Sequence, residues 1–208
     1  MLCQSNYINE GGYGSIYKLN EKECVKLFKF NDNFDPVIIN KIKDLKLKNY
    51  YEIKKLLFNE NNDFIGYSMK YYEKLNLDLL TCDVSYILDS LYYLYNSIKK
   101  LSDNNIYVCD MRVANSLLTK DGIIVIDIDN YVFNKLYNDI NDLCIDNLMS
   151  LRNLFVHLFL NSKDKFHSSF NIDLYKWELK GIFDINNGFE NARKVLGKYK
   201  YPIDYFKG

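Results

Sequence analysis

Residues 105–133, NIYVCDMRVANSLLTKDGIIVIDIDNYVF, place polar side chains on a loop that leads into an expected buried hairpin. Asp110 and Asn115 are five positions apart, with apolar residues before and after them. Asp127 interrupts the apolar run that starts at residue 123, at the point where a β-strand is expected to end. A carboxylate there is costly to bury unless a cation or a hydrogen-bond donor meets it.

These residue types favour a site for magnesium and phosphate. Asn115 and Asp127 offer oxygen ligands, and we expect them to face one another across a short hairpin. Mg²⁺ is usually held by one or two carboxylates together with substrate phosphates and water. Asp110 would then be free to accept a proton. Mg-nucleotide chemistry is therefore the first hypothesis for this chain.

The order of these residues resembles the catalytic and metal-binding loops of the protein-kinase superfamily, in which H-R-D-x-x-x-x-N precedes D-F-G. The chain reads VCDMRVAN at residues 108–115 and DID at residues 127–129. The spacing from Asp to Asn matches, but the His and Arg of the first motif are absent, and Asp129 replaces the Gly of the second. The resemblance implies that Asp110 orients or deprotonates an acceptor hydroxyl and that Arg112 offsets charge on the transferred phosphoryl group.

A glycine cluster near the N-terminus, EGGYGSIYK at residues 10–18, is similar to the glycine-rich loop of the same superfamily. Glycines allow backbone N–H groups to approach phosphate closely. Asn9 stands where the motif G-x-G-x-x-G-x-V has its first glycine. Lys26, on an expected strand at residues 24–29, matches the lysine that contacts the α- and β-phosphates. An ordinary hairpin with a glycine-rich turn and a surface lysine is the competing interpretation.

The segment at residues 69–72, MKYY, ends the second strand of an expected hairpin at residues 53–58 and 64–69. It resembles the gatekeeper and hinge, which implies that Met69 lines the back of an ATP pocket and that backbone groups of Lys70 and Tyr72 face adenine. The nucleotide-binding residues implied by the resemblance are Gly11, Gly12, Gly14, Ile16, Lys26, Met69, Lys70 and Tyr72.

Helical patterns occupy much of the remaining chain. Apolar residues at positions 87, 88, 91, 94, 95, 98 and 101 predict a helix over residues 84–101. Residues 40–49 are helix-like and rich in lysine, and the tail from Ser162 is expected to form small helices. Residues 146–155 resemble the buried helix that supports the kinase catalytic loop, which implies that Asp146 holds backbone amides of that loop.

Two departures from the kinase pattern matter for function. Active kinases pair the phosphate-contacting lysine with a glutamate on the helix of the small lobe. Asn40 and Lys41 fall near that position and are not acidic, and Asp44 would serve only if the helix were rotated or shifted. Only residues 128–145 separate Asp127 from the next expected helix, with no A-P-E signature. We therefore expect neither regulation by activation-loop phosphorylation nor an extended peptide groove.

Composition indicates a small globular protein. The chain has 208 residues, 48% of them hydrophobic, which suits one domain. Lys plus Arg and Asp plus Glu are equal at 27 each, so net charge does not favour a nucleic-acid partner. Five cysteines without paired C-x-x-C spacing argue against a disulfide framework or a zinc site. No signal peptide, membrane span or membrane partner is expected, and the cytoplasm is the expected location.

The sequence thus predicts an α+β, two-lobed protein-kinase-like fold in a single domain. The β-rich N-lobe is expected at residues 1–70, the hinge at residues 71–75 and the mainly helical C-lobe at residues 76–208. The expected activity is ATP- and Mg²⁺-dependent transfer of the γ-phosphoryl group to a hydroxyl of a protein or small-molecule acceptor. A pseudokinase that acts as a nucleotide-binding or regulatory module is the alternative, and nucleotidyl transfer is a third possibility.

Overall fold

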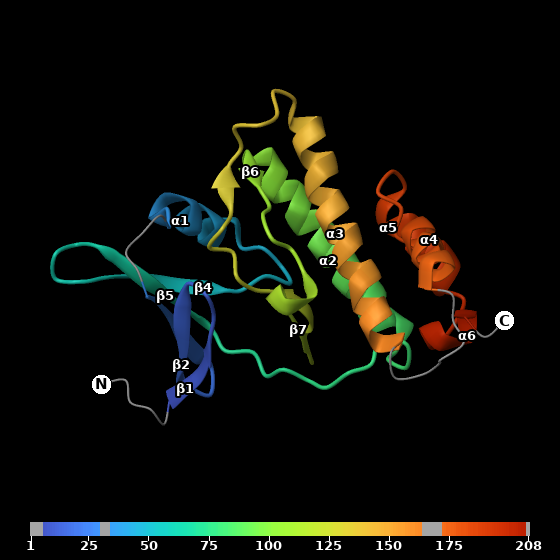
Figure 1. The fold of residues 1–208 in the computed structure, drawn as a ribbon, viewed down its shortest axis with the longest axis horizontal. Coiled ribbons are helices and arrows are strands. Elements are labelled where there is room, and N and C mark those ends of the chain that lie inside the picture. Colours follow the sequence, from blue (N-terminus) through green and yellow to red (C-terminus); the bar gives the residue numbers. More distant parts are fainter. Residues whose placement is uncertain (1–5, 30–33, 164–171, 207–208) are drawn as a thin grey trace.

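The computed structural model describes residues 6–29, 34–163 and 172–206, which form an α+β fold around a five-stranded antiparallel sheet (Figure 1). The strand order is β1-β2-β3-β5-β4. The strands are β1 (Tyr7–Glu10), β2 (Gly14–Asn20), β3 (Glu23–Phe28), β4 (Ile53–Phe58) and β5 (Phe64–Lys70). The predicted α+β class is confirmed, and so is the hairpin predicted at residues 53–58 and 64–69.

Helix α1 (Pro36–Leu45) follows the sheet's first three strands and contacts β4. The Asp35 side chain accepts a hydrogen bond from the Val37 N–H at 2.8 Å, and Pro36 suits the first turn because no N–H is needed there. Lys46, with φ of 48°, ends the helix. The predicted boundaries at residues 40–49 are therefore wrong, because capping sets the ends of this helix. Its buried residues are Ile38, Ile39 and Ile42.

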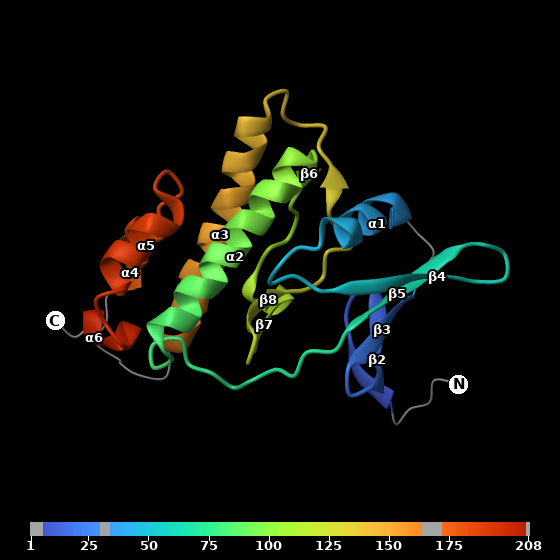
Figure 2. The same ribbon diagram turned by 180° about the vertical axis from the view of Figure 1, so that it is seen from behind.

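Helices α2 (Val84–Asp103) and α3 (Ile140–Lys163) lie side by side on the other side of the molecule (Figures 1 and 2). Asp83 caps α2 by accepting a hydrogen bond from the Ser85 N–H at 2.8 Å. The helices predicted at residues 84–101 and 146–155 are confirmed. Ser162, where the predicted tail begins, still belongs to α3, and residues 164–171 lie outside the described residues. From residue 172 the tail forms the predicted small helices α4 (Ile172–Ile182), α5 (Gly188–Leu196) and α6 (Pro202–Phe206). The buried face of α2 includes Ile87, Leu91, Leu94, Ile98 and Leu101.

Short strands connect the sheet to the helices. β6 (Ile106–Tyr107) pairs with β9 (Val132–Phe133), and β7 (Ser116–Thr119) pairs with β8 (Gly122–Val125), which is buried at every residue. The 3₁₀ turn η2 (Val113–Asn115) precedes β7. The Val125 N–H donates to the Asn49 carbonyl at 2.8 Å, and the Val125 carbonyl accepts from the Tyr51 N–H at 3.0 Å. Backbone hydrogen bonds thus fix β8 to the segment that leads into β4.

Helix α3 has the length and apolar composition of a membrane-spanning helix. Residues 140–161 of α3 are long and apolar enough to cross a membrane, with a mean hydropathy of 1.2. Half of the most apolar window is buried inside the protein, as in the core helix of a soluble protein.

Gly66 sets the spacing between β3 and β5, with φ of 150°, and an added Cβ would lie 2.0 Å from the Lys26 carbonyl oxygen. We expect Gly66→Ala to lower the free energy of unfolding by roughly 1–3 kcal/mol, because the strands must move apart. Urea unfolding measures this loss. Gly181→Ala on α4 is the control, since a Cβ there meets nothing within 4 Å and alanine favours the helix. Equal stability of the two variants would contradict this prediction.

Candidate functional site

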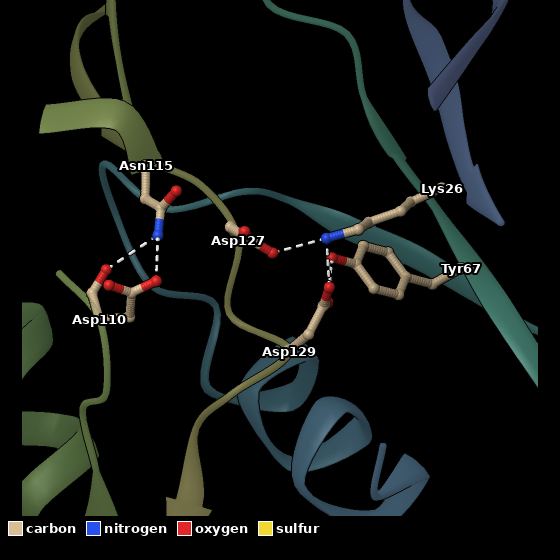
Figure 3. Close-up of polar contacts among 6 residues, drawn as sticks. All are labelled: Lys26, Tyr67, Asp110, Asn115, Asp127 and Asp129. Atoms are coloured by element: carbon tan, nitrogen blue, oxygen red, sulfur yellow. Dashed lines mark hydrogen bonds and ion pairs between the residues drawn. The ribbon is translucent and has the colours of Figure 1, made fainter. Parts of the chain in front are cut away.

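Polar side chains from distant parts of the chain meet between the sheet and the β7–β8 hairpin (Figure 3). β3 supplies Lys26, and the loop after β8 supplies Asp127 and Asp129. Asp110 follows β6, and Asn115 ends η2. The structure therefore gathers one lysine, three carboxylates and one amide at the place where the fold joins its sheet to its helices.

Lys26 is the cation at the centre of this group. Its Nζ lies 2.5 Å from Oδ1 of Asp127 and also forms an ion pair with Oδ2 of Asp129. The Tyr67 hydroxyl, on β5, donates a hydrogen bond to Oδ1 of Asp129 at 2.7 Å. The Lys26 side chain is 8% exposed, that of Asp127 27% and that of Asp129 0%. Buried charges are tolerated when each has such partners.

Lys26 forms ion pairs with two carboxylates, so negative charge exceeds positive charge in this group, and the pKa values of the three residues shift accordingly. Burial acts to lower the pKa of Lys26, but attraction by Asp129 and Asp127 outweighs burial and raises it. Burial acts to raise the pKa of Asp127, but Lys26 outweighs burial and lowers it. Burial and repulsion by Asp127 raise the pKa of Asp129 to about 6 despite Lys26. Asp127 is therefore the more readily ionised and the more accessible carboxylate.

Asp110 sits in a tight loop with an unusual backbone conformation. Its φ is 59°, and that of Asp127 is 62°, values that residues other than glycine rarely adopt. The Asn115 amide donates to the backbone carbonyl of Asp110 at 2.9 Å and to its carboxylate at 3.0 Å. Nε of Arg112 lies 3.1 Å from the other carboxylate oxygen. The Asp110 side chain is 34% exposed, so its carboxylate remains partly open to solvent.

The two predicted metal ligands come from adjacent loops. Figure 3 shows Asp127 between Asn115 and Lys26, with its carboxylate directed toward the lysine. The Ile126 N–H donates to the Asn115 backbone carbonyl at 2.9 Å, which ties the two loops together. Among the described residues, no group of three or more His, Cys, Asp and Glu side chains could hold a metal ion. A cation here would therefore need ligands from Asp127, Asn115 and a bound molecule.

Asn147, on α3, holds the loop that carries Asp110. Its side-chain oxygen accepts from the Val108 N–H at 2.8 Å, and its amide donates to the Ile106 carbonyl at 3.0 Å. The prediction that Asp146 holds this loop is wrong, because Asp146 instead accepts from the Tyr137 hydroxyl at 2.9 Å. One step along a helix changes the direction of a side chain by about 100°. Asn147, which carries no charge, is fully buried at this position.

The glycine-rich turn joins β1 to β2. The Gly11 N–H donates to the Gly14 carbonyl at 2.9 Å. A Cβ on Gly14 would lie 2.6 Å from the Leu27 carbonyl oxygen, so packing against β3 requires glycine there. A Cβ on Gly12 would meet nothing within 4 Å, so the fold does not explain that glycine. Ile16 pairs in register with Lys26 and is half-buried.

The predicted hinge residues continue the sheet. Met69 is fully buried, and the Lys70 N–H donates to the Glu52 carbonyl at 2.9 Å. The Tyr72 ring stacks on Tyr51 with centroids 6.1 Å apart. The Lys70 carbonyl accepts a contact from the Cys24 thiol at 3.8 Å. Side chains and backbone therefore fix this segment.

A cavity of about 790 Å³ lies next to the site and reaches Asp129 and Cys109. Burial and the neighbouring Asp110 raise the pKa of the Cys109 thiol, which makes it a poor nucleophile. The lining of the cavity is mainly apolar and comes from the glycine-rich turn, from α1 and the residues before it, and from residues 129–136. The aromatic residues of the lining are Tyr13, Phe34, Tyr107, Tyr131 and Phe133.

Sequence reasoning missed Asp129 and Tyr67 as partners of the lysine. In the sequence, Asp129 only stands at the position of a motif glycine, and Tyr67 is one of 19 tyrosines. A second carboxylate two positions after Asp127 was the available signal. Asp44, the acidic residue considered on α1, lies near Asn40 and Lys43 at the surface.

No protein-family model matches the chain, and a search of curated proteins finds no match either. Functional assignment therefore depends on the geometry of the site.

Lys26→Met should lower the free energy of unfolding by about 3–5 kcal/mol at pH 7, because it leaves two carboxylates without their cation. In the variant, the pKa values of both carboxyls in the folded state should rise above those in the unfolded chain. The loss should then be largest at neutral pH and shrink as the pH falls toward 5, since protonation removes the unpaired charges.

Urea unfolding at pH 7 and pH 5 measures both effects. Lys120→Met, at an exposed position in the β7–β8 turn, is the control and should change stability little at either pH. A loss for Lys26→Met that is the same at both pH values would show that the ion pairs do not cause it.

Proposed function

We propose that the chain is a kinase-like phosphotransferase that binds ATP with Mg²⁺ and transfers the γ-phosphoryl group to a hydroxyl. The observation that carries the proposal is the contact between Lys26 and Asp127, 101 residues apart in sequence, beside Asp110 and Asn115. A lysine, a carboxylate at a strand end and a second carboxylate with its asparagine are the groups that phosphoryl transfer needs.

The charge balance of the site suits a divalent cation. Asp127 and Asp129 together exceed the charge of Lys26, and Asp127 is ionised and partly exposed. Asp127 and the side-chain oxygen of Asn115 would hold Mg²⁺, which usually keeps water and phosphate oxygens as its other ligands. When bound, Mg²⁺ would neutralise charge on the transferred phosphoryl group. We therefore assign Asn115 and Asp127 as the metal-binding residues.

The phosphates would lie between Lys26 and the glycine-rich turn. Gly12 supports this placement. A side chain at this position would fit the fold, so packing does not require a glycine there, whereas close approach of phosphate to the backbone would. Backbone N–H groups of the turn can approach phosphate oxygens closely when no Cβ intervenes. Ile16 and Met69 would border the base, with the backbone of Lys70 and Tyr72 along its edge.

Asp110 is proposed to orient or deprotonate the acceptor hydroxyl. Its hydrogen bonds to Asn115 fix the loop, while its carboxylate stays partly open to solvent. Arg112, which is mostly exposed, would offset charge on the moving phosphoryl group. Catalysis would then depend mainly on positioning and electrostatics.

The arrangement of the elements supports a division into two lobes. The sheet with α1 would form the small lobe, and α2 to α6 would belong to the large one. The Leu75 N–H donates to the Leu118 carbonyl at 2.7 Å, which attaches the proposed hinge to β7. Residues 128–139 are all that connect Asp127 to α3, and the neighbouring cavity leaves room for a small acceptor. We favour a small-molecule acceptor and a cytoplasmic location.

A pseudokinase is the second candidate. Lys26 is already neutralised by two carboxylates, and Met69, which would border the base, is fully buried. A regulatory module would need the fold without transfer. Nucleotidyl transfer is also compatible with the same residues.

We expect ATP to raise the melting temperature of the wild-type protein more with Mg²⁺ than without it. A ligand at about 100 times its Kd adds roughly 2.7 kcal/mol to stability. Asp127→Asn should abolish the extra Mg²⁺-dependent rise and keep the fold, whereas Asp89→Asn on the exposed side of α2 should not change it. Thermal unfolding measures these shifts. An unchanged Mg²⁺-dependent rise in Asp127→Asn would exclude Asp127 as a ligand.

Asp110→Asn should bind Mg-ATP as the wild type does but hydrolyse it about 10²–10⁴ times more slowly, because water, the simplest acceptor, loses its base. Release of inorganic phosphate measures the rate, and binding is measured by calorimetry. Equal rates in the variant and the wild type would remove Asp110 from the mechanism. Binding without hydrolysis in the wild type would favour the pseudokinase.

A further inference from the structure

Asp129 has the most deeply buried carboxylate of the site, and both of its oxygens have partners. One oxygen forms the ion pair with Lys26, and the other accepts the hydrogen bond from Tyr67. Figure 3 shows its side chain directed toward these two residues of the sheet. Asp127, by contrast, is 27% exposed. The two carboxylates of this loop therefore have different surroundings and should have different roles.

Helix α1 offers no acid to Lys26 among the described residues. Asp44, its one carboxylate, lies 3.2 Å from the amide of Asn40 on the exposed side of the helix. The face of α1 that points into the protein is formed by isoleucines. Any group that fixes Lys26 must therefore come from elsewhere in the fold.

We propose that Asp129, held by Tyr67, is the residue that positions Lys26 for phosphate binding, in place of an acid on α1. This inference rests on the proposed function. Lys26 and Tyr67 are register partners on adjacent strands, so the sheet fixes the lysine and the tyrosine relative to each other. Asp129 closes the triangle from the loop after β8.

The loop itself is anchored between its two carboxylates. Ile128 is fully buried in the core, so Asp127 and Asp129 are held on either side of a fixed residue. The metal ligand and the partner of the lysine thus belong to one three-residue segment. Lys26 is held without any contribution from the position of α1, so displacement of this helix would not release the lysine from its partner.

The role of Asp129 can be separated from that of a metal ligand by ATP titrations with and without Mg²⁺. If Asp129 acts through Lys26, Asp129→Asn should weaken ATP binding about tenfold both with and without Mg²⁺. The variant loses the ion pair between Asp129 and Lys26, so the lysine is no longer held where it contacts phosphate. Tyr67→Phe should weaken it in the same direction but less. Asp127→Asn should remove only the part of the affinity that depends on Mg²⁺.

Isothermal calorimetry on the full chain measures these affinities, with Asp44→Asn as the control that should bind like the wild type. In a Lys26→Met background, Asp129→Asn should cause no further loss of affinity, because the residue it acts through is gone. Three results would each overturn the proposal. They are a loss of ATP affinity seen only in the presence of Mg²⁺, an unchanged ATP affinity in a folded Asp129→Asn variant, and additive losses of affinity in the double variant.

A second measurement does not depend on nucleotide. In urea unfolding, the double variant of Lys26→Met and Asp129→Asn should lose less stability than the sum of the single variants, because the two residues form one contact. Strictly additive losses would overturn the pairing. A wild-type protein that binds no nucleotide would contradict the proposed function, and this unfolding cycle would then decide whether Asp129 holds Lys26.

Discussion

The rest of the structure depends on one buried lysine and its two carboxylates. Lys26 on β3 contacts Asp127 and Asp129 on the loop after β8, which joins the sheet to the part of the fold that carries Asp110. Removing one partner from a buried ion pair leaves an uncompensated charge, which costs about 3–5 kcal/mol. The backbone hydrogen bonds between Val125 and the segment before β4 also hold the β7–β8 hairpin to the sheet. Separation of the sheet from the β7–β8 hairpin is therefore unfavourable.

The same contact gives the site its chemical character. Two carboxylates share one lysine, so the more exposed Asp127 keeps its negative charge, while burial raises the pKa of Asp129. Asp110 and Asp127 both adopt positive φ values, so each of the two loops turns sharply at its carboxylate. The proposed binding of Mg²⁺ and phosphate depends on this excess of negative charge and on the partial exposure of Asp127.

Periodicity and motif order in the sequence predicted β3, the β4–β5 hairpin and α2, and they indicated Lys26, Asp110, Asn115 and Asp127 as site residues. Partners that depend on tertiary packing were not predictable. Nothing local in the sequence distinguishes Tyr67 from the other tyrosines, and Asp129 becomes the partner of the lysine only because β3, β5 and β8 converge. Asp146 and Asn147 are neighbours on α3 and point in different directions, so only Asn147 reaches the loop that carries Asp110. The start of α1 depends on the cap at Asp35 and its end on the left-handed backbone of Lys46, and helical periodicity indicates neither.

The most direct test of the account is a crystal structure of the protein with Mg²⁺ and a non-hydrolysable ATP analogue. The account predicts a metal ion about 2.0–2.1 Å from oxygens of Asp127 and Asn115. It also predicts a phosphate oxygen within hydrogen-bond distance of Lys26, with Asp129 still bound to Tyr67. A nucleotide bound elsewhere, or a Mg²⁺ ion without contact to Asp127, would contradict it.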